Sequence, residues 1–332
     1  AEGTEPKSGK AKYQQPYTSM KYMFGTLELT DQAIEAAKGG DIKAVASILA
    51  TEITALKDDF KLDLNRILHG AGTGQLCLTT GTGANSTGPV VLDSNPNGGD
   101  PNEYLSEGMY IDLQTAGTNQ VYALVGTTGI YLTTATTWVN NEMITKMDDA
   151  EAMGIAGIID DGDNVATIQA MARASHPFAN SFVYDTATTL TEQNMISTYI
   201  KTRRYGGAKV CLMGSDLYTK YGILLTGTRQ TPPTPQKVLS GGWEGLSFMG
   251  GKCPVVLDFD TWSGYVQFVD LDALTIAEMS KPFAWLEADA YGGILKRSAS
   301  NRTIWEGTLK YYFNLVGLKF KSSARMSGQT SG

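Results

Sequence analysis

The chain has 332 residues, a hydrophobic content of 42%, a charged content of 18% and a formal net charge of −7. These values are typical of a folded protein with room for two or three compact units, and they exclude an extensively disordered chain. The net negative charge disfavours a protein whose main task is to grip nucleic acid, because that task needs a dense basic surface. The 37 glycines cluster in strand-and-turn segments and indicate much β structure.

The three cysteines, Cys77, Cys211 and Cys253, are widely spaced and form no C-x-x-C pair. Buried reduced thiols in a cytoplasmic product are the expected state. No run of about 18 apolar residues occurs, so we expect no membrane span. No signal peptide is visible. The sequence begins at Ala1 without methionine, which predicts a processed or trimmed start.

Residues 1–29 carry no helical stripe, and their aromatic residues lie among Pro, Gly and polar residues. Short period-two alternations at 22–24 and 27–29 predict extended strands. We expect an arm or projecting hairpin with little core of its own, whose exposed aromatic residues mark a partner surface. A short helix is expected at 31–38, with Thr30 as its cap and Gly39-Gly40 as its stop.

The stretch 41–70 predicts one long helix. Its apolar residues recur at gaps of three and four, which places them in a single stripe. Asp41 is placed to cap its start and Gly70 to end it. At 1.5 Å per residue, this helix is a rod of about 43 Å, along which the rest of a domain is expected to pack.

The two flanks of this helix differ in charge. Lys43, Lys57 and Lys61 lie on one flank, and Asp41, Glu52, Asp59 and Asp63 lie on the other. One interpretation is that other parts of the same chain neutralise these charges. The other is that a neighbouring copy lies alongside, basic flank against acidic flank, as head-to-tail rings require.

The glycine-rich segment 70–88 is not a phosphate-binding loop. Its G-x-G-x-G pattern lacks the G-x-G-x-x-G spacing and follows a helix rather than a strand, and no G-x-x-x-x-G-K-[ST] occurs. From 90 to 145, short strands and turns predict a small antiparallel β subdomain. The acidic run that contains Asp160, Asp161 and Asp163 lacks EF-hand spacing, and we expect a solvated turn there.

Residues 190–290 have an α/β pattern. Helices are expected at 191–204 and 215–225, with Thr191 as a cap, and strands at 209–213, 255–257 and 265–269. The Pro- and Thr-rich segment 226–237 predicts an exposed loop. The last fifty residues return to strands, including a long alternating segment at 309–320, and the polar tail 321–332 is expected to fray.

No motif predicts catalysis or a metal site. The chain has two histidines, His69 and His176, and no H-E-x-x-H or G-x-S-x-G pattern. His69 ends the long helix, where an imidazole suits the helix dipole. We therefore predict that the chain is not an enzyme and holds no cofactor or metal.

The order of segments resembles the major capsid proteins of tailed bacteriophages with the Hong Kong 97-type fold. The closest likenesses are Phe24–Thr30 (FGTLELT), 33–36 (AIEA), Asp63–Arg66 (DLNR) and the G-x-G-T-G at 70–74; looser ones are MGIAG at 153–157 and GGWEGLSF at 241–248. These motifs mark a family rather than a reaction.

The resemblance implies an α+β fold with an extended loop, a long spine helix, an antiparallel peripheral-domain sheet and an α/β axial domain. In this sequence, it places the extended loop or arm at 1–29, the peripheral domain at 30–75 with the spine helix at 41–69, an inserted β subdomain at 76–150, the axial domain at 151–275, and the returning peripheral strands and tail at 276–332. Some relatives cross-link Lys to Asn between subunits.

The resemblance also implies a function and partners. The chain is expected to self-assemble, as pentamers and hexamers, into the icosahedral head that encloses the double-stranded DNA of a tailed bacteriophage. A scaffold, a portal and decoration proteins are expected partners, with weak non-specific contact to DNA, no membrane, and assembly in the host bacterial cytoplasm. Candidate contacts between subunits are Lys10, Tyr13, Tyr17, Tyr22, Phe24, Lys57, Asp59, Lys61 and Asp63. The alternatives are the shell of a bacterial nanocompartment (encapsulin-like) and a decoration or tail protein.

Overall fold

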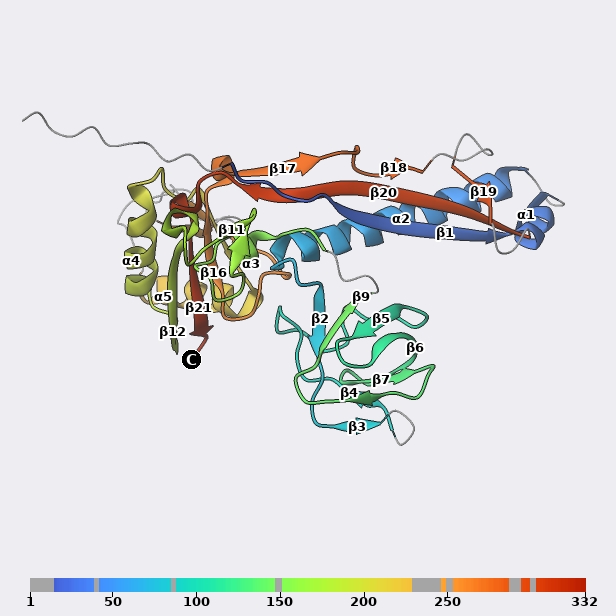
Figure 1. Cartoon of the computed structure of the whole chain (residues 1–332), viewed down its shortest axis with the longest axis horizontal. Coiled ribbons are helices and arrows are strands. Elements are labelled where there is room, and N and C mark those ends of the chain that lie inside the picture. Colours follow the sequence, from blue (N-terminus) through green and yellow to red (C-terminus); the bar gives the residue numbers. More distant parts are fainter. Residues whose placement is uncertain are drawn as a thin grey trace, which may run out of the picture.

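The computed structural model describes residues 15–38, 42–84, 88–146, 151–228, 246–248, 253–286, 294–298 and 303–332. The fold is mixed α+β. Figure 1 shows an elongated body with a compact domain at one end and a separate lobe on one side. Within the described residues, no helix is long and apolar enough to cross a membrane.

Helices occupy α1 (Asp31–Lys38), α2 (Ile42–His69), α3 (Ile155–Ile158), α4 (Glu192–Arg203) and α5 (Ser215–Thr228), with 3-10 turns η1 (Pro177–Ala179), η2 (Leu271–Ala273) and η4 (Phe320–Ser322). The long sheet consists of β1 (Lys21–Thr30), β20 (Ile304–Gly317), β17 (Leu274–Glu278), β18 (Ala284–Trp285) and β19 (Lys296–Arg297). The end sheet has the order β12 (Phe182–Thr189), β21 (Ala324–Thr330), β16 (Val266–Val269), β13 (Val210–Met213), β15 (Cys253–Leu257), β14 (Leu246–Phe248).

The lobe sheet has the order β2 (Gln75–Leu78), β9 (Met143–Lys146), β5 (Tyr110–Leu113), β6 (Gly117–Val125), β7 (Gly129–Leu132), β4 (Val90–Val91). Two short ribbons pair β3 (Gly83–Ala84) with β8 (Thr137–Trp138), and β10 (Thr167–Ile168) with β11 (Met171–Ala172). The lobe has its own core, which includes Leu76, Ile111 and Ile130. Every strand pair of this sheet is antiparallel, as the strand-and-turn pattern at 90–145 predicts.

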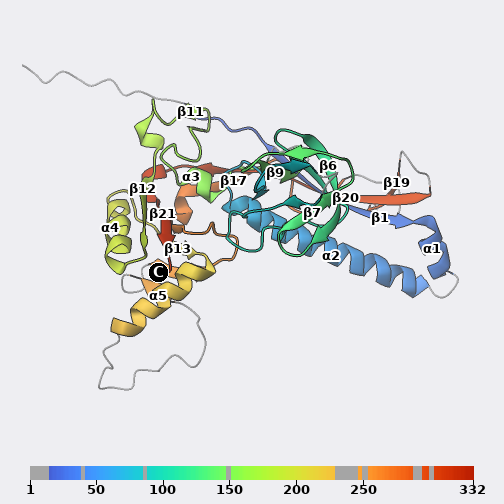
Figure 2. The same ribbon diagram turned by 90° about the horizontal axis from the view of Figure 1, so that it is seen from below.

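The long helix and the long sheet form the body. α2 is continuous over its 28 residues, as its periodicity predicts, although Asp41 lies outside the described residues. Phe60 and Ile67 of its stripe are buried against Leu309 and Phe313 of β20. Figure 2 shows α2 extending along the body from beside the end domain toward the far end, where β1 leads into α1.

The expectation of a projecting arm is wrong for residues 21–29. These residues form β1, which pairs antiparallel with β20 along its whole length, from Lys21 opposite Phe313 to Thr30 opposite Ile304. Met23 and Leu27 point inward and are buried. A side chain at Gly25 would place Cβ at 3.1 Å from both Leu56 and Phe60, so glycine lets the strand lie against the helix. Residues 1–14 lie outside the described part of the chain.

The prediction of a frayed tail is also wrong. Residues 324–330 form β21, which lies inside the end sheet, parallel to β12 and antiparallel to β16. Met326 faces the apolar core of the end domain, and Arg325 is buried on the other face of the sheet. The polar composition of this segment misled the prediction, because a strand between two others satisfies its backbone groups and can bury polar side chains that find partners.

Asp160 is the partner that allows Arg325 to be buried, and the expectation of a solvated turn at this carboxylate is wrong. The Arg325 guanidinium donates to Asp160 at 2.9 Å, and both side chains are almost completely buried. The second Asp160 oxygen accepts from the backbone N–H groups of Gly162, Asn164 and Val165. A buried carboxylate is tolerated here because both of its oxygens accept hydrogen bonds and one of them pairs with a guanidinium.

Other local predictions hold. α1 has the predicted bounds, and Thr191 caps α4 by accepting from the backbone N–H of Asn194 at 3.3 Å. α5 continues to Thr228, beyond the predicted end at 225, and the rest of the expected loop lies outside the described residues.

Two glycines explain the MGIAG motif. A Cβ on Gly154 would lie 2.4 Å from the carbonyl oxygen of Gly70, and one on Gly157 would lie 3.1 Å from the Cα of Ala71. α3 therefore packs directly against the backbone at the end of α2, which only glycine permits at these positions.

We expect Gly154→Ala to destabilise the protein by about 2–4 kcal/mol, because the new methyl group must displace backbone atoms rather than a flexible side chain. Urea unfolding of the purified chain measures this change. Gly88→Ala is the matched control, since a Cβ there meets nothing within 4 Å. Equal midpoints for the two variants would contradict the close approach of α3 to α2.

Candidate functional site

Potential metal ligands and thiols are the first candidates for a reactive centre within the described residues. These residues contain no group of three or more His, Cys, Asp or Glu side chains placed to hold a metal ion. Cys77, Cys211 and Cys253 are all free and buried, as predicted. Burial raises the pKa of the Cys77 thiol to about 12, which disfavours the nucleophilic thiolate.

An aromatic patch lies on the outer face of the long sheet. The exposed fractions of Tyr22 and Phe24 on β1 are 58% and 54%. Their rings lie 4.9 and 5.7 Å from the ring of Tyr312 on the neighbouring strand β20, and Lys310 lies over Tyr312. The inward residues of the same strands contact α2, so the pleat itself directs these aromatic rings away from the core.

The other candidate contact residues of the N-terminal segment are Lys10, Tyr13 and Tyr17. Tyr17 is 74% exposed and its backbone N–H donates to the carbonyl of Gln169 at 3.3 Å. Lys10 and Tyr13 lie outside the described residues. The structure therefore brings together Tyr22 and Phe24 of the predicted contact residues.

The charged flanks of α2 are used unequally. Asp59 is exposed and Lys57 is half-buried. Lys61 pairs with Asp58 at 2.8 Å, but both side chains are about 60% exposed, so this pair contributes little stability. Asp63 is bound within the chain by Lys146 at 2.5 Å and by Arg66 at 3.0 Å. Neutralisation by the same chain, one of the two interpretations of these flanks, therefore applies to Asp63.

The last turns of α2 form a polar junction with the segments on either side of the lobe. Arg66 donates to Asp63 and to both carboxylate oxygens of Glu151, and its guanidinium lies 5.8 Å from the ring centroid of Tyr104. Lys146, at the end of β9, reaches back to Asp63. Burial alone would lower the pKa of Arg66, but Glu151 and Asp63 raise it above its ordinary value, so the guanidinium stays charged.

The same junction continues into the end domain. Asn65 donates to Asp258 at 3.1 Å and to Asp260 at 2.6 Å, and His69 Nε2 lies 3.2 Å from Asp258. Tyr104 of the lobe donates to the other oxygen of Asp260 at 2.8 Å. One stretch of helix thus holds both the lobe and the end-domain loop, which predicts that the three parts keep a fixed relative orientation.

Sequence reasoning missed this junction, although it singled out the D-L-N-R motif. Within that motif, Asp63, Asn65 and Arg66 all serve the junction, and the partners lie far away in sequence. Among those partners, only the dense carboxylates of the segment D-F-D at 258–260 gave a local signal.

Comparison with known proteins gives a fold but no sequence relative. No family model matches the sequence, and no curated protein matches it. A structure titled as the capsid asymmetric unit of cyanophage A-1(L) aligns with a TM-score of 0.52 and 14% identity, over 93% of this chain and 77% of that chain. The chain has a fold found in a phage capsid.

Two further solved structures align less well. One is a satellite phage P4 procapsid with its size determination protein, with a TM-score of 0.43 and 9% identity over 99% of this chain and 77% of that one. The other is an encapsulin complex from Synechococcus elongatus, with a TM-score of 0.32 and 13% identity over 54% of this chain and 57% of that one.

The junction predicts a pH dependence of stability. Burial raises the pKa of Asp63, but Lys146 and Arg66 outweigh burial and hold this pKa below its ordinary value. A depressed folded-state pKa contributes stability above the unfolded value of about 3.9 and loses it as the pH falls through the folded value.

We therefore expect Asp63→Asn to cost about 1–3 kcal/mol at pH 6, less than for a fully buried pair because Asp63 is 21% exposed. The deficit should shrink as the pH falls below the unfolded value of about 3.9 and through the lowered folded-state pKa of Asp63, because the wild-type carboxylate then becomes protonated. Urea unfolding across this range measures both effects, with Asp100→Asn on the exposed surface of the lobe as the control. A deficit that is constant with pH would contradict the assigned charge state.

Proposed function

We propose that the chain is a major capsid protein that assembles into the icosahedral head of a tailed bacteriophage and encloses double-stranded DNA. The observation that carries this proposal is the alignment with the cyanophage capsid structure over 93% of the chain. The elongated body with an aromatic outer face supports it, because a shell protein needs broad contacts with neighbouring copies.

The parts of the chain have the following roles in this proposal, which adopts the Hong Kong 97-type organisation. α2 is the spine helix, the long sheet belongs to the peripheral domain, and the end sheet with α4 and α5 forms the axial domain at the centre of each pentamer or hexamer. The strand β21 extends the axial domain beyond 151–275 to include 324–330. The partners are other copies of the chain, a scaffold, a portal, decoration proteins and, weakly, the packaged DNA.

A nanocompartment shell is the second candidate, because an encapsulin also aligns with about half of this chain. The DNA head is preferred because the capsid alignment covers nearly the whole chain. Electron microscopy of the expressed protein tests both proposals. Closed icosahedral particles support a shell, and their contents, DNA or a cargo enzyme, distinguish the two. Particles that form only on a preformed head would instead indicate a decoration protein.

The aromatic patch is expected to be a contact between copies. We expect the double variant Tyr22→Ser/Phe24→Ser to reduce the yield of particles at least about tenfold, because exposed aromatic side chains dominate interface energies. Sedimentation of the expressed protein measures the yield. Tyr122→Ser is the matched control, since Tyr122 is 72% exposed but belongs to the lobe. Equal yields for both variants would remove the patch from the interface.

The free part of the charged flanks gives a second test. If Asp59 meets the basic flank of a neighbouring copy, Asp59→Lys should lower assembly at low salt, and added salt should reduce the difference because it screens surface charges. Light scattering during assembly at several salt concentrations measures this effect. Asp100→Lys makes the same charge change on the lobe. An unchanged salt response for Asp59→Lys would show that this flank makes no contact between copies.

A further inference from the structure

A groove lies where the long sheet passes into the end domain. Its volume is about 480 Å³, and its walls come from the β10–β11 turn, η1, the end of α4 and the crossover from β20 to β21. Met171 and Phe320 are buried in it, while Phe178, Tyr205 and Leu318 on its rim remain 53%, 40% and 60% exposed. A groove of this size and composition is typical of a binding site for apolar side chains.

The charged side chains that line the groove are all positive. Lys319 and Lys321 line it, and no Asp or Glu is among the described residues that do. The ammonium of Lys321 lies 5.8 Å from the ring centroid of Tyr205. Arg204, exposed, precedes Tyr205 in the chain. An occupant is therefore expected to combine apolar side chains with carboxylates.

One wall of the groove is a tight hairpin turn. Gln169 and Ala170, at the tip of the β10–β11 turn, have φ values of 49° and 61°, in the left-handed region that favours glycine. Gln169 is buried, donates to the carbonyl of Gly317 at 3.1 Å and accepts from the backbone N–H of Tyr17. A two-residue hairpin turn of type I′ requires positive φ at both central residues, and the hydrogen bonds of Gln169 fix this turn against the rest of the groove.

We propose that this groove binds an acidic peptide segment with apolar side chains, contributed by a separate polypeptide. Carboxylates of the segment pair with Lys319 and Lys321, and an apolar side chain enters between Phe178 and Leu318. Nucleic acid fits less well, because two lysines do not form the continuous basic track that a phosphate backbone requires.

A second copy of this chain is the weaker choice of occupant. Phe259 and Leu271 are exposed apolar residues with a carboxylate on each side. The carboxylates beside Phe259 already accept hydrogen bonds from Asn65, and Asp272, beside Leu271, pairs with Lys209. Their own chain therefore holds the charges that the groove would need.

The position of the groove gives its occupant a role in assembly. Residues 318–323 connect β20 of the long sheet to β21 of the end sheet, and several of them line the groove. A bound segment touches both parts of the molecule and stabilises one angle between them. This role rests on the proposed shell function, whereas binding itself does not.

Peptide binding to the purified full-length chain tests the proposal. The probe is a labelled synthetic peptide in which Glu alternates with Leu and Phe, and its counterpart carries Lys in place of Glu. Fluorescence anisotropy should detect binding of the acidic peptide only. The variant Lys319→Glu/Lys321→Glu should weaken binding at least about tenfold, and Leu318→Asp should weaken it independently.

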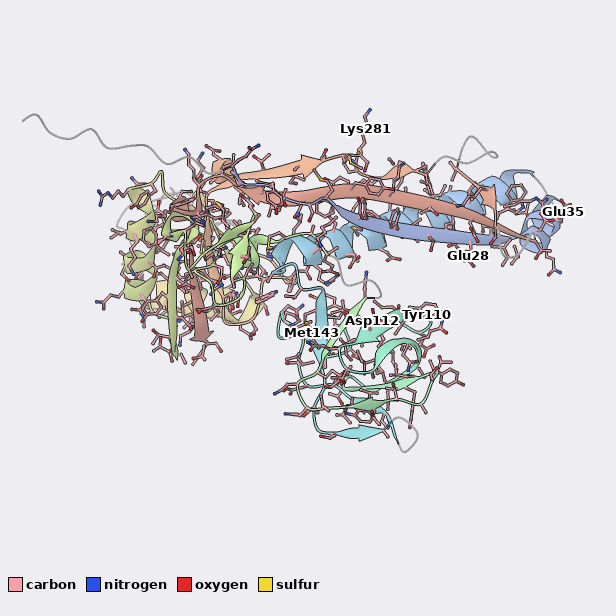
Figure 3. All side chains as sticks on the ribbon, viewed as in Figure 1. Glu28, Glu35, Tyr110, Asp112, Met143 and Lys281 are labelled. Carbon is pink, nitrogen blue, oxygen red and sulfur yellow. The ribbon has the colours of Figure 1, made fainter. Side chains whose placement is uncertain are left out.

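Lys281→Glu is the matched control, because Lys281 is exposed and does not line the groove. Its side chain projects outward from the long sheet, on the side away from α2 (Figure 3). This variant should leave the affinity for the acidic peptide within about twofold. Unfolding midpoints confirm that each variant is folded.

Three results would overturn the proposal: equal binding of both peptides, tighter binding of a single-stranded oligonucleotide, or self-association of the chain that the lysine variant abolishes. Particle formation is scored separately. Loss of peptide binding with intact particles, or peptide binding without any particles, tells a failure of the shell function apart from a failure of the groove.

Discussion

The last turns of α2 are the constraint on which the rest of the structure depends. Asp63, Asn65 and Arg66 face different segments of the chain, and each makes charged or amide hydrogen bonds to side chains far away in sequence. The helix therefore does more than bury an apolar stripe against the long sheet. It fixes where the lobe begins, where the end-domain loop lies and how both are oriented. These groups are largely removed from water, so breaking one interaction would leave another charge without a partner. Because that costs free energy, the intact network favours a single arrangement of the junction.

Close backbone contact reinforces this junction. Gly25 brings β1 against the middle of α2, and Gly154 and Gly157 bring α3 against its end. In the end domain, the ion pair of Arg325 with Asp160 ties β21 to the segment that follows α3. The first and last described strands thus lie within the same framework, because β1 belongs to the long sheet and β21 to the end sheet (Figure 1). These contacts hold the long sheet, α2 and the end sheet in fixed positions relative to one another.

Local patterns predicted the helices well and the long-range pairing poorly. The period of apolar residues in α2, the bounds of α1 and the cap of α4 are local signals, and the structure follows them. The N-terminal strand and the C-terminal strand were misread, since pairing with a distant strand decides whether a polar, alternating segment is exposed or buried. Burial of Asp160 was missed for the same reason: its partner Arg325 is 165 residues away. Of the candidate surface, the exposure of Tyr22 and Phe24 was expected from a projecting arm, but it arises because these residues alternate with buried Met23 along the paired strand β1. The role of Asp63 within its own chain required the fold.

The exposed surfaces of the described residues are suited to contacts with other polypeptides. The outer aromatic patch and the exposed Asp59 of α2 are open to neighbouring copies, and the groove is the proposed site for an acidic peptide. Sedimentation velocity of the purified full-length chain across a range of concentrations tests this account most directly. The account predicts particles of very high mass with a narrow size distribution. A single species with the mass of one subunit at every concentration would contradict it.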